Sequence, residues 1–258
     1  MISWAGHGED QILRRVLIDR TAGTYIDIGA AHPKFGSVTY ALYELGWRGI
    51  AIEPREELAK TWSKKRPEDL LISSALTTEG LDGWITSQGF RSRFTQEIEA
   101  TPGIKYSRSK AVSTAKLFTI TKNHLNSAPT FIKVDIEGGE YKIVTSMLSL
   151  GFHPEIWIIE VVDQYNSEHI RRTPSLLLEA FLSKFNYQMV LFDGVNEWYV
   201  INSSKALHRN IWAPAYPGVE DFIPFHLTVN YRVRNFLHSK RERMLKKAKV
   251  FIKLENRK

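Results

Sequence analysis

Short, almost unbroken apolar runs alternate with amphipathic stretches along most of the chain. Strands are predicted at 24–28, 49–54, 70–72, 131–135 and 155–162, where Ile, Val, Leu and aromatic residues fit strands packed on both faces. Helices are predicted at 8–19, 38–45, 55–65, 140–150 and from Pro174 onward, from residue spacing and flanking Gly and Pro. This alternation predicts an α/β fold with a doubly wound, mostly parallel sheet and helices on both faces.

A hairpin is predicted after the last of these helices. Residues 187–192 and 198–201 resemble strands and flank Asp193-Gly194-Val195-Asn196, which is typical of a turn. Such a hairpin would close the parallel sheet with an antiparallel strand. The sequence therefore predicts one domain over 1–202 and a C-terminal extension over 203–258 that ends in a basic, helix-like tail.

The stretch from Gly80 to Lys116 has no clear period. It holds several Gly and Pro residues and the basic side chains Arg91, Arg93 and Arg108. A connection of this length inside a compact domain is usually functional or disordered. Two interpretations stay open, namely a lid whose arginines contact an acidic or phosphate-linked acceptor, and a solvated loop.

Composition narrows the class of protein. Of 258 residues, 43% are hydrophobic and 24% charged, which is ordinary for a soluble globular chain. No apolar run approaches the ~20 residues of a membrane span, and no signal peptide is visible at the start. The absence of Cys excludes disulfides, thiolate nucleophiles and Cys-ligated zinc. We expect a cytoplasmic protein.

The net charge of +7 comes from the end of the chain. Residues 230–258 hold 11 Lys and Arg and two acids, which leaves 24 basic and 26 acidic residues for 1–229. Apolar residues such as Phe236, Leu237 and Leu245 lie among these basic ones, as in an amphipathic helix at an anionic membrane surface. A nucleic-acid contact and a solvated or oligomer-packing helix are the alternatives.

Four predicted strands carry an acid at or near the carboxyl end, namely Asp27, Glu53, Asp135 and Glu160. Carboxyl ends of parallel strands lie along one edge of a sheet, so we expect these acids to share a cleft. Helix caps or sheet-edge charges are the alternative. Lys133 is expected on the face opposite Asp135, with a structural role.

The turn after the first strand discriminates between cofactors. Gly29-Ala30-Ala31-His32-Pro33-Lys34 lacks the later glycines of the dinucleotide fingerprint and the Gly-Lys-Ser/Thr of a P-loop. Glu53 follows Gly29 at about the ~20-residue offset of an acid that accepts hydrogen bonds from a ribose. This pattern suits S-adenosylmethionine, which has no phosphate to hold and whose ammonium group favours carboxylates.

Four blocks carry a family resemblance, namely Gly8-Glu9-Asp10 and the ranges 25–30, 43–53 and 131–140. In this order they resemble the FkbM family of S-adenosylmethionine-dependent methyltransferases, and 191–200 is similar to the closing segment of members linked to glycan biosynthesis. The resemblance implies a class I methyltransferase fold and O-methylation, often of a sugar hydroxyl. Members often have a Gln two residues before the Gly-Glu-Asp, where this chain has Gly6.

The resemblance also implies roles for single residues. It implies cofactor contacts for Asp27, Gly29, Ala30 and Glu53, with Ser74 and Ala75 near the adenine. Glu9, Pro54 and Asp135 lie in or beside the matching blocks and are further cofactor candidates.

A sugar hydroxyl is a poor nucleophile, so methyl transfer needs a base or a metal to take up its proton. His32 is a candidate base because of its titration range, with a structural hydrogen bond as the alternative. Asp135 and Glu137 are further catalytic candidates, although Glu137 also suits a helix N-terminus. Asp135, Glu160 and Asp163 offer three oxygens to Mg²⁺, the second candidate cofactor.

The sequence thus predicts an S-adenosylmethionine-dependent O-methyltransferase for a sugar hydroxyl of a surface polysaccharide or lipid-linked glycan. The tail would add peripheral contact with the inner face of an anionic membrane. An RNA methyltransferase steered by the tail and a non-catalytic, membrane-associated glycan-binding module are the alternatives. Nucleic acid is the weaker partner, because no Asn-Pro-Pro-Tyr-like motif and no Cys are present. The sequence leaves an oligomer open.

Overall fold

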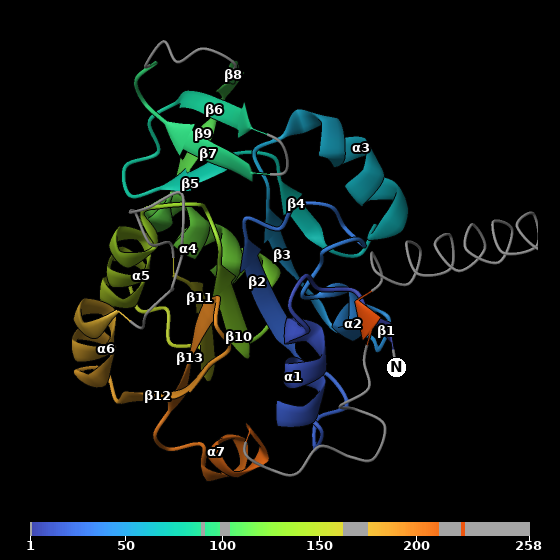
Figure 1. The fold of residues 1–258 in the computed structure, drawn as a ribbon, viewed down its shortest axis with the longest axis vertical. Coiled ribbons are helices and arrows are strands. Elements are labelled where there is room, and N and C mark those ends of the chain that lie inside the picture. Colours follow the sequence, from blue (N-terminus) through green and yellow to red (C-terminus); the bar gives the residue numbers. More distant parts are fainter. Residues whose placement is uncertain (1, 89–90, 99–103, 162–174, 212–222, 225–258) are drawn as a thin grey trace, which may run out of the picture.

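A seven-stranded sheet organises the computed structural model, which describes residues 2–88, 91–98, 104–161, 175–211 and 223–224. Its strand order is β12-β13-β11-β10-β2-β3-β4 (Figure 1). The strands from β11 to β4 are parallel, and β13 runs antiparallel to both β11 and β12. The predicted doubly wound, mostly parallel sheet with its closing antiparallel hairpin is confirmed. The strands are β2 (Thr24–Ile28), β3 (Arg48–Ile52), β4 (Leu70–Ile72), β10 (Phe131–Val134), β11 (Ile156–Glu160), β12 (Tyr187–Phe192) and β13 (Asn196–Ile201).

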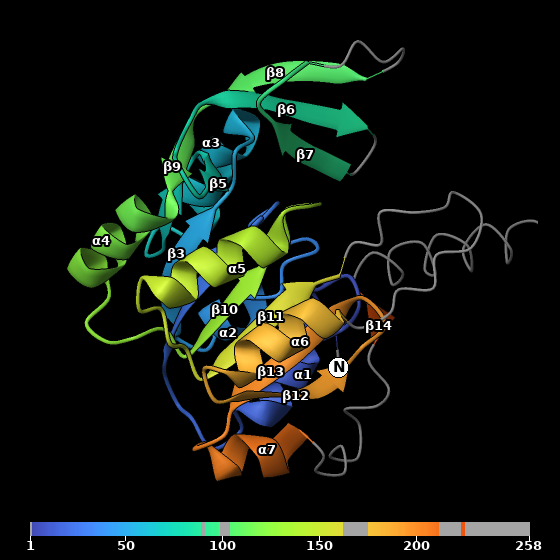
Figure 2. The same cartoon turned by 90° about the vertical axis from the view of Figure 1, so that its left-hand side faces the viewer.

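Helices cover both faces of this sheet, because alternate residues of each buried strand point to opposite sides (Figures 1 and 2). On one face, Ile26 and Ile28 pack in a core cluster with α4, α5 and α6. On the other face, Tyr25 packs in a second cluster with α1, α2 and α7. Near the third strand, Trp62 of α3 packs on Ala30 and Ala51. The helices are α1 (Glu9–Val16), α2 (Tyr40–Tyr43), α3 (Glu56–Lys65), α4 (Thr114–His124), α5 (Glu140–Ser149), α6 (Leu176–Ser183) and α7 (Lys205–Ile211).

In its described residues, the stretch from 80 to 116 forms a small sheet and the start of α4, so the interpretation as a solvated loop was wrong, whereas the lid stays a prediction. β6 (Gly83–Gln88) pairs antiparallel with β7 (Arg91–Thr95) and with β8 (Lys105–Ser109). Beside it, β5 (Ala75–Thr77) pairs with β9 (Ala111–Ser113). The pattern was not recognised because β7 and β8 are mostly polar and their described side chains are mostly half-buried or exposed, so they show no apolar alternation. The small sheet lies over one end of the main sheet (Figure 2).

The last described segments return to the start of the chain. Asn210 of α7 donates to Val16 O at 3.2 Å and to Asp19 Oδ2 at 3.0 Å, which fastens α7 to α1. β14 (Ile223–Pro224) pairs with β1 (Ile2–Ser3). The predicted basic helix over 231–258 lies outside the described residues. Among the described helices, none combines the length and the apolar character that a membrane crossing requires.

Candidate active site

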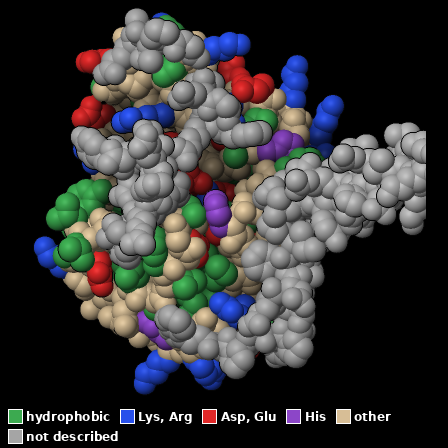
Figure 3. Space-filling view, viewed as in Figure 1, with side chains coloured by type: hydrophobic (Ala, Val, Ile, Leu, Met, Phe, Trp, Pro, Cys, Tyr) green, Lys and Arg blue, Asp and Glu red, His purple; other side chains and the backbone are tan. Residues whose placement is uncertain are grey.

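A cavity of about 450 Å³ opens between the carboxyl ends of the central strands and the small sheet. Gly29, Glu53 and Asp135 follow β2, β3 and β10 and line one side, whereas Ile85 and Phe94 of the small sheet line the other. Acidic side chains are visible inside the hollow in the space-filling view (Figure 3). The volume lies within the range of about 300–1,000 Å³ that is usual for small-molecule sites.

The predicted site residues divide into two groups around this cavity. Those on its lining are Gly29, Glu53, Pro54, Ala75, Asp135 and Glu137. Those that do not line it are Glu9, Asp27, Ala30, His32, Ser74 and Glu160. Asp163 lies outside the described residues.

Gly29 allows the turn after β2 to pass close to the end of β10. Its φ is +77°, and a Cβ at this position would lie 1.6 Å from Asp135 O. The Gly29 and Ala30 N–H groups both donate to Ile52 O, at 3.0 and 3.1 Å. A glycine is therefore required here on two grounds, the left-handed backbone and the lack of space for any side chain.

Glu53 is buried at the cavity wall, and its carboxylate is held on both oxygens. Ala31 N–H donates to Oε2 at 2.8 Å, and the Arg55 backbone N–H and Nε donate to Oε1 at 3.0 and 2.7 Å. Ala31 itself has a φ of 51°, which is unusual for a residue other than glycine. The Glu53 carboxylate thus stabilises the turn that would face a cofactor.

Lys133 lies beside Asp135, and the expectation that it points to the opposite face was wrong. Residues i and i+2 of a strand share a face, and Lys133 Nζ donates to Asp135 Oδ2 at 2.8 Å. The Lys133 ammonium is also 3.9 Å from Asp27 Oδ1. Burial alone would lower the pKa of Lys133, but the carboxylates of Asp135 and Asp27 raise it well above the usual value. A buried ammonium ion therefore fixes the carboxylate at the cavity.

Asp27 is fully buried behind the cavity. Burial raises its pKa, and Lys133 and Arg66 act in the opposite direction. Thr39 Oγ1 donates to Asp27 Oδ2 at 2.9 Å and accepts from Arg66 Nη1 at 2.9 Å. Asp27 therefore does not face the cavity but stabilises the residues behind it.

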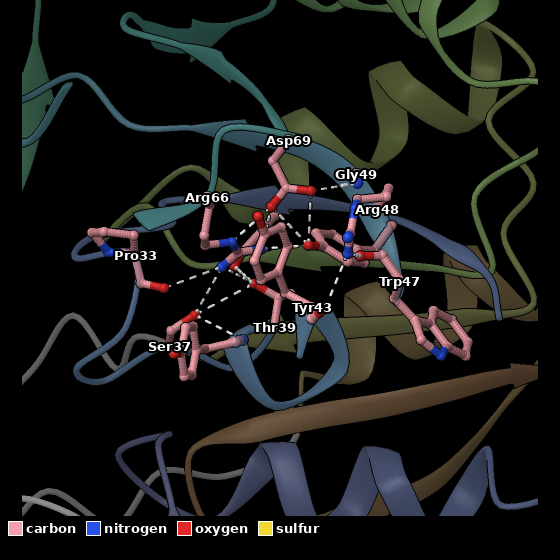
Figure 4. Close-up of polar contacts among 12 residues, drawn as sticks. Pro33, Ser37, Thr39, Tyr43, Trp47, Arg48, Gly49, Arg66 and Asp69 are labelled. Atoms are coloured by element: carbon pink, nitrogen blue, oxygen red, sulfur yellow. Dashed lines mark hydrogen bonds and ion pairs between the residues drawn. The ribbon is translucent and has the colours of Figure 1, made fainter. Parts of the chain in front are cut away.

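Arg66 anchors a polar network that was not predicted from the sequence (Figure 4). It is 1% exposed, and its Nε donates to Asp69 Oδ2 at 2.7 Å. Its Nη1 contacts Pro33 O and Ser37 Oγ at 3.4 and 3.3 Å. Asp69 Oδ1 accepts from Gly49 N–H at 2.8 Å, which ties the network to β3. The network holds the segment after the Gly29–Ala31 turn against the sheet.

A strained loop follows β10 at the other side of the cavity. Glu137 has a φ of 58°, and Gly138 and Gly139 have φ values of 125° and 103°. Glu140 Oε1 accepts from Gly138 N–H at 2.8 Å and from Ile136 N–H at 3.3 Å. Strained backbone of this kind is often found at functional sites, and only the Gly-Gly pair was a visible signal in the sequence.

Three carboxylates converge near this loop. Asp135, Glu137 and Glu160 each place an oxygen within 4.8 Å of the others. Glu160 ends β11, the neighbour of β10, as the strand pattern indicated. Glu137, which the sequence analysis named as a catalytic candidate, is the third member of this group, and the predicted ligand Asp163 lies outside the described residues.

His32 and Glu9 make local contacts away from the cavity. His32 Nδ1 accepts from Lys34 and Phe35 N–H at 3.1 and 3.0 Å, and the ring stacks on Phe35. Burial lowers the pKa of His32, and Lys65 adds to this effect. Glu9 accepts from His7 N–H at 2.8 Å and from Asn196 Nδ2 at 3.2 Å. Burial opposes ionisation of Glu9, but the His7 side chain, the backbone N–H groups of Glu9 and His7 and the Lys133 ammonium leave its pKa lowered.

Several lining residues had no signal in the sequence. Ser92, Phe94, Thr95 and Gln96 come from β7 and the residue after it, in the segment without a period, and Lys142 comes from the first turn of α5. The residues of β7 and Gln96 reach the cavity only because the small sheet folds back over the strand ends.

A family of known proteins and several solved structures are similar to this chain. A family model described as the methyltransferase FkbM domain matches residues 27–189. No curated protein sequence matches the chain. A TehB-like SAM-dependent methyltransferase from Corynebacterium glutamicum is similar in structure, with 7% identity, a TM-score of 0.40 and coverage of 75% of this chain and 86% of that one. A 1,6-didemethyltoxoflavin-N1-methyltransferase from Burkholderia thailandensis has 12% identity, a TM-score of 0.40 and coverage of 77% of both chains. Since the family model spans more than half of the sequence, the chain belongs to the FkbM family of methyltransferases.

Proposed function

We propose that the protein transfers a methyl group from S-adenosylmethionine to a sugar hydroxyl of a glycan or lipid-linked glycan. The observation that carries the proposal is the Asp135 carboxylate on the cavity lining, fixed by the buried Lys133. The family resemblance supports both the cofactor and the acceptor class.

The cavity offers suitable groups for each part of the cofactor. The turn at Gly29 would receive the methionine part, because it brings the backbone close to Asp135. Glu53, Pro54 and Ala75 would surround the ribose and adenine. A carboxylate accepts about four hydrogen bonds, and Glu53 already accepts from Ala31 and Arg55. A ribose hydroxyl would therefore displace the Arg55 guanidinium.

Methyl transfer to a sugar hydroxyl requires a protein group beside the sugar that takes up the hydroxyl proton. The sugar oxygen attacks the methyl carbon, the carbon–sulfur bond breaks, and S-adenosylhomocysteine leaves. The hydroxyl proton passes to a carboxylate, for which we propose Asp135 or Glu137. His32 is a weaker candidate than the sequence suggested, because its Nδ1 already accepts from the turn and its ring does not line the cavity.

A metal would serve the same step. Asp135, Glu137 and Glu160 form a donor set of hard oxygens that fits Mg²⁺, and such an ion would lower the pKa of a bound hydroxyl. We expect activity to fall in EDTA and to recover with Mg²⁺. Glu160→Gln should raise the Mg²⁺ concentration required, whereas Glu57→Gln on the exposed side of α3 should not. Full activity in EDTA would mean that a carboxylate takes up the hydroxyl proton without the help of a metal ion.

The main experiment measures methyl transfer directly. The purified protein is incubated with isotope-labelled S-adenosylmethionine and glycan extracts, and the products are analysed by mass spectrometry. We expect label on a sugar oxygen, and we expect Asp135→Asn to lower the rate by about 10²–10⁴-fold.

Two results would contradict the proposal. Absence of S-adenosylmethionine binding by calorimetry would remove the cofactor, and with it the reaction. Label on RNA rather than on glycan would favour the RNA methyltransferase, and that labelling should then fall when 230–258 are deleted. Cofactor binding without transfer to any extract would favour the glycan-binding module.

A further inference from the structure

We propose that the acceptor carries an anionic group, a carboxylate or a phosphate, which Arg93 and Lys142 bind at the rim of the cavity. The inference rests on the proposed function and specifies the substrate class of the same site.

Arg93 extends from the small sheet to the strained loop on the opposite side. Its side chain is exposed, and a Cβ at Gly138 would lie 3.6 Å from Arg93 Nε and 3.7 Å from Cζ. Gly138 lines the cavity, so the Arg93 guanidinium lies at the edge of the hollow. These distances are ordinary van der Waals separations, so the guanidinium lies directly beside Gly138.

Lys142 approaches the same loop from the helix. It lies in the first turn of α5 and lines the cavity. Within the described part of the chain, neither the Lys142 ammonium nor the Arg93 guanidinium takes part in a hydrogen bond or ion pair. Two cations that form no ion pair thus lie next to the loop after β10.

Three other basic side chains of the described residues near the strand ends already have a partner. Arg55 pairs with Glu53 at 2.7 Å, and Lys133 pairs with Asp135 at 2.8 Å. Arg108 of the small sheet lies over the Trp84 ring, 5.8 Å from its centroid. Among these basic groups, only Arg93 and Lys142 lie at the cavity and form neither an ion pair nor a cation–π contact.

The position of this pair favours a ligand on the acceptor rather than on the cofactor. Glu53 and Pro54 lie after β3, whereas Arg93 lies beside Gly138 in the loop after β10 and Lys142 lines the cavity from the first turn of α5. S-adenosylmethionine would occupy the side at Gly29 and Glu53. An Arg guanidinium binds carboxylate or phosphate through two parallel hydrogen bonds, and Lys adds a point charge. A neutral sugar offers neither.

The experiment compares matched probes on the protein saturated with S-adenosylhomocysteine. Glucuronic acid and glucose 1-phosphate are the anionic probes, glucose is the neutral one, and binding is followed by ligand-observed NMR titration. We expect at least one anion to bind about tenfold more tightly than glucose. The preference should decline as salt is added, because the site is open to solvent. The two anionic probes distinguish a uronic acid from a sugar phosphate.

The variants assign the preference to the two residues. Arg93→Gln combined with Lys142→Gln should bring the anion and glucose to equal affinity, while the affinity for S-adenosylhomocysteine stays unchanged. Arg209→Gln is the matched control, because Arg209 lies on α7 at the opposite end of the molecule and is 74% exposed (Figure 1). It should keep the full preference.

Equal binding of anions and glucose, no detectable binding of either anion, or a preference that survives the double variant would each overturn the inference. Failure of the proposed function is a separate result, since it would be seen as a lack of S-adenosylhomocysteine binding before any sugar is added.

Discussion

Lys133→Met is expected to lower kcat by about 100-fold or more and to destabilise the fold by about 3 kcal/mol. Removing one partner of a buried ion pair leaves an uncompensated charge, which typically costs about 3–5 kcal/mol. Here two carboxylates depend on one ammonium, at 2.8 Å from Asp135 and 3.9 Å from Asp27. Without it, the Asp135 carboxylate loses the contact that fixes its orientation. Steady-state kinetics and thermal unfolding measure the two effects.

Asp135→Asn separates a positioning role of Lys133 from a structural one. This variant should lose turnover as well, but it should retain most of the stability, because Asp135 is 34% exposed and Lys133 keeps Asp27 as a partner. Lys116→Met, on the exposed side of α4, should change neither quantity. A Lys133→Met protein that unfolds earlier yet turns over at the normal rate would limit Lys133 to stability.

The main sheet could be predicted from the sequence because its signals are local. The ends of β2 and β4 were predicted at the residues observed. Each central strand is a dense apolar run buried on both faces, and Glu53 and Asp135 follow directly at the carboxyl ends. Parallel pairing then places these acids at one cavity without further information.

The small sheet over the cavity and the Arg66 network behind it could not be predicted, because both depend on contacts between residues that are far apart in the sequence. The polar strand β7 joins the site only through the fold of the small sheet. Arg66 follows a charged helix and looks like a surface residue, yet it is buried against Asp69 and Thr39. Lys133 is a different case, because its position could have been predicted. Residues i and i+2 of a strand share a face, which places Lys133 beside Asp135, and the expectation of opposite faces misapplied this rule.

Gly29→Ala is expected to abolish cofactor binding and to destabilise the fold by several kcal/mol. The φ of +77° alone costs an L residue about 1–2 kcal/mol. The added Cβ would lie 1.6 Å from Asp135 O, so β2 and β10 would have to separate at their carboxyl ends. That movement would shift the turn at Ala31 and the carboxylate at Asp135 together. Calorimetry with S-adenosylmethionine and thermal unfolding measure the two effects.

Gly36→Ala measures the free-energy cost of a positive φ without the steric clash that Gly29→Ala adds. Gly36 has nearly the same φ, +75°, but a Cβ there would meet nothing within 4 Å. Only the backbone cost remains, which at about 1 kcal/mol corresponds to a Tm lower by about 2–4 °C in a chain of this size, with cofactor binding retained. Equal losses in the two variants would mean that the contact between Gly29 and Asp135 is not what holds the cavity in shape. A loss confined to Gly29→Ala would mean that the cavity depends on the close approach of β2 and β10.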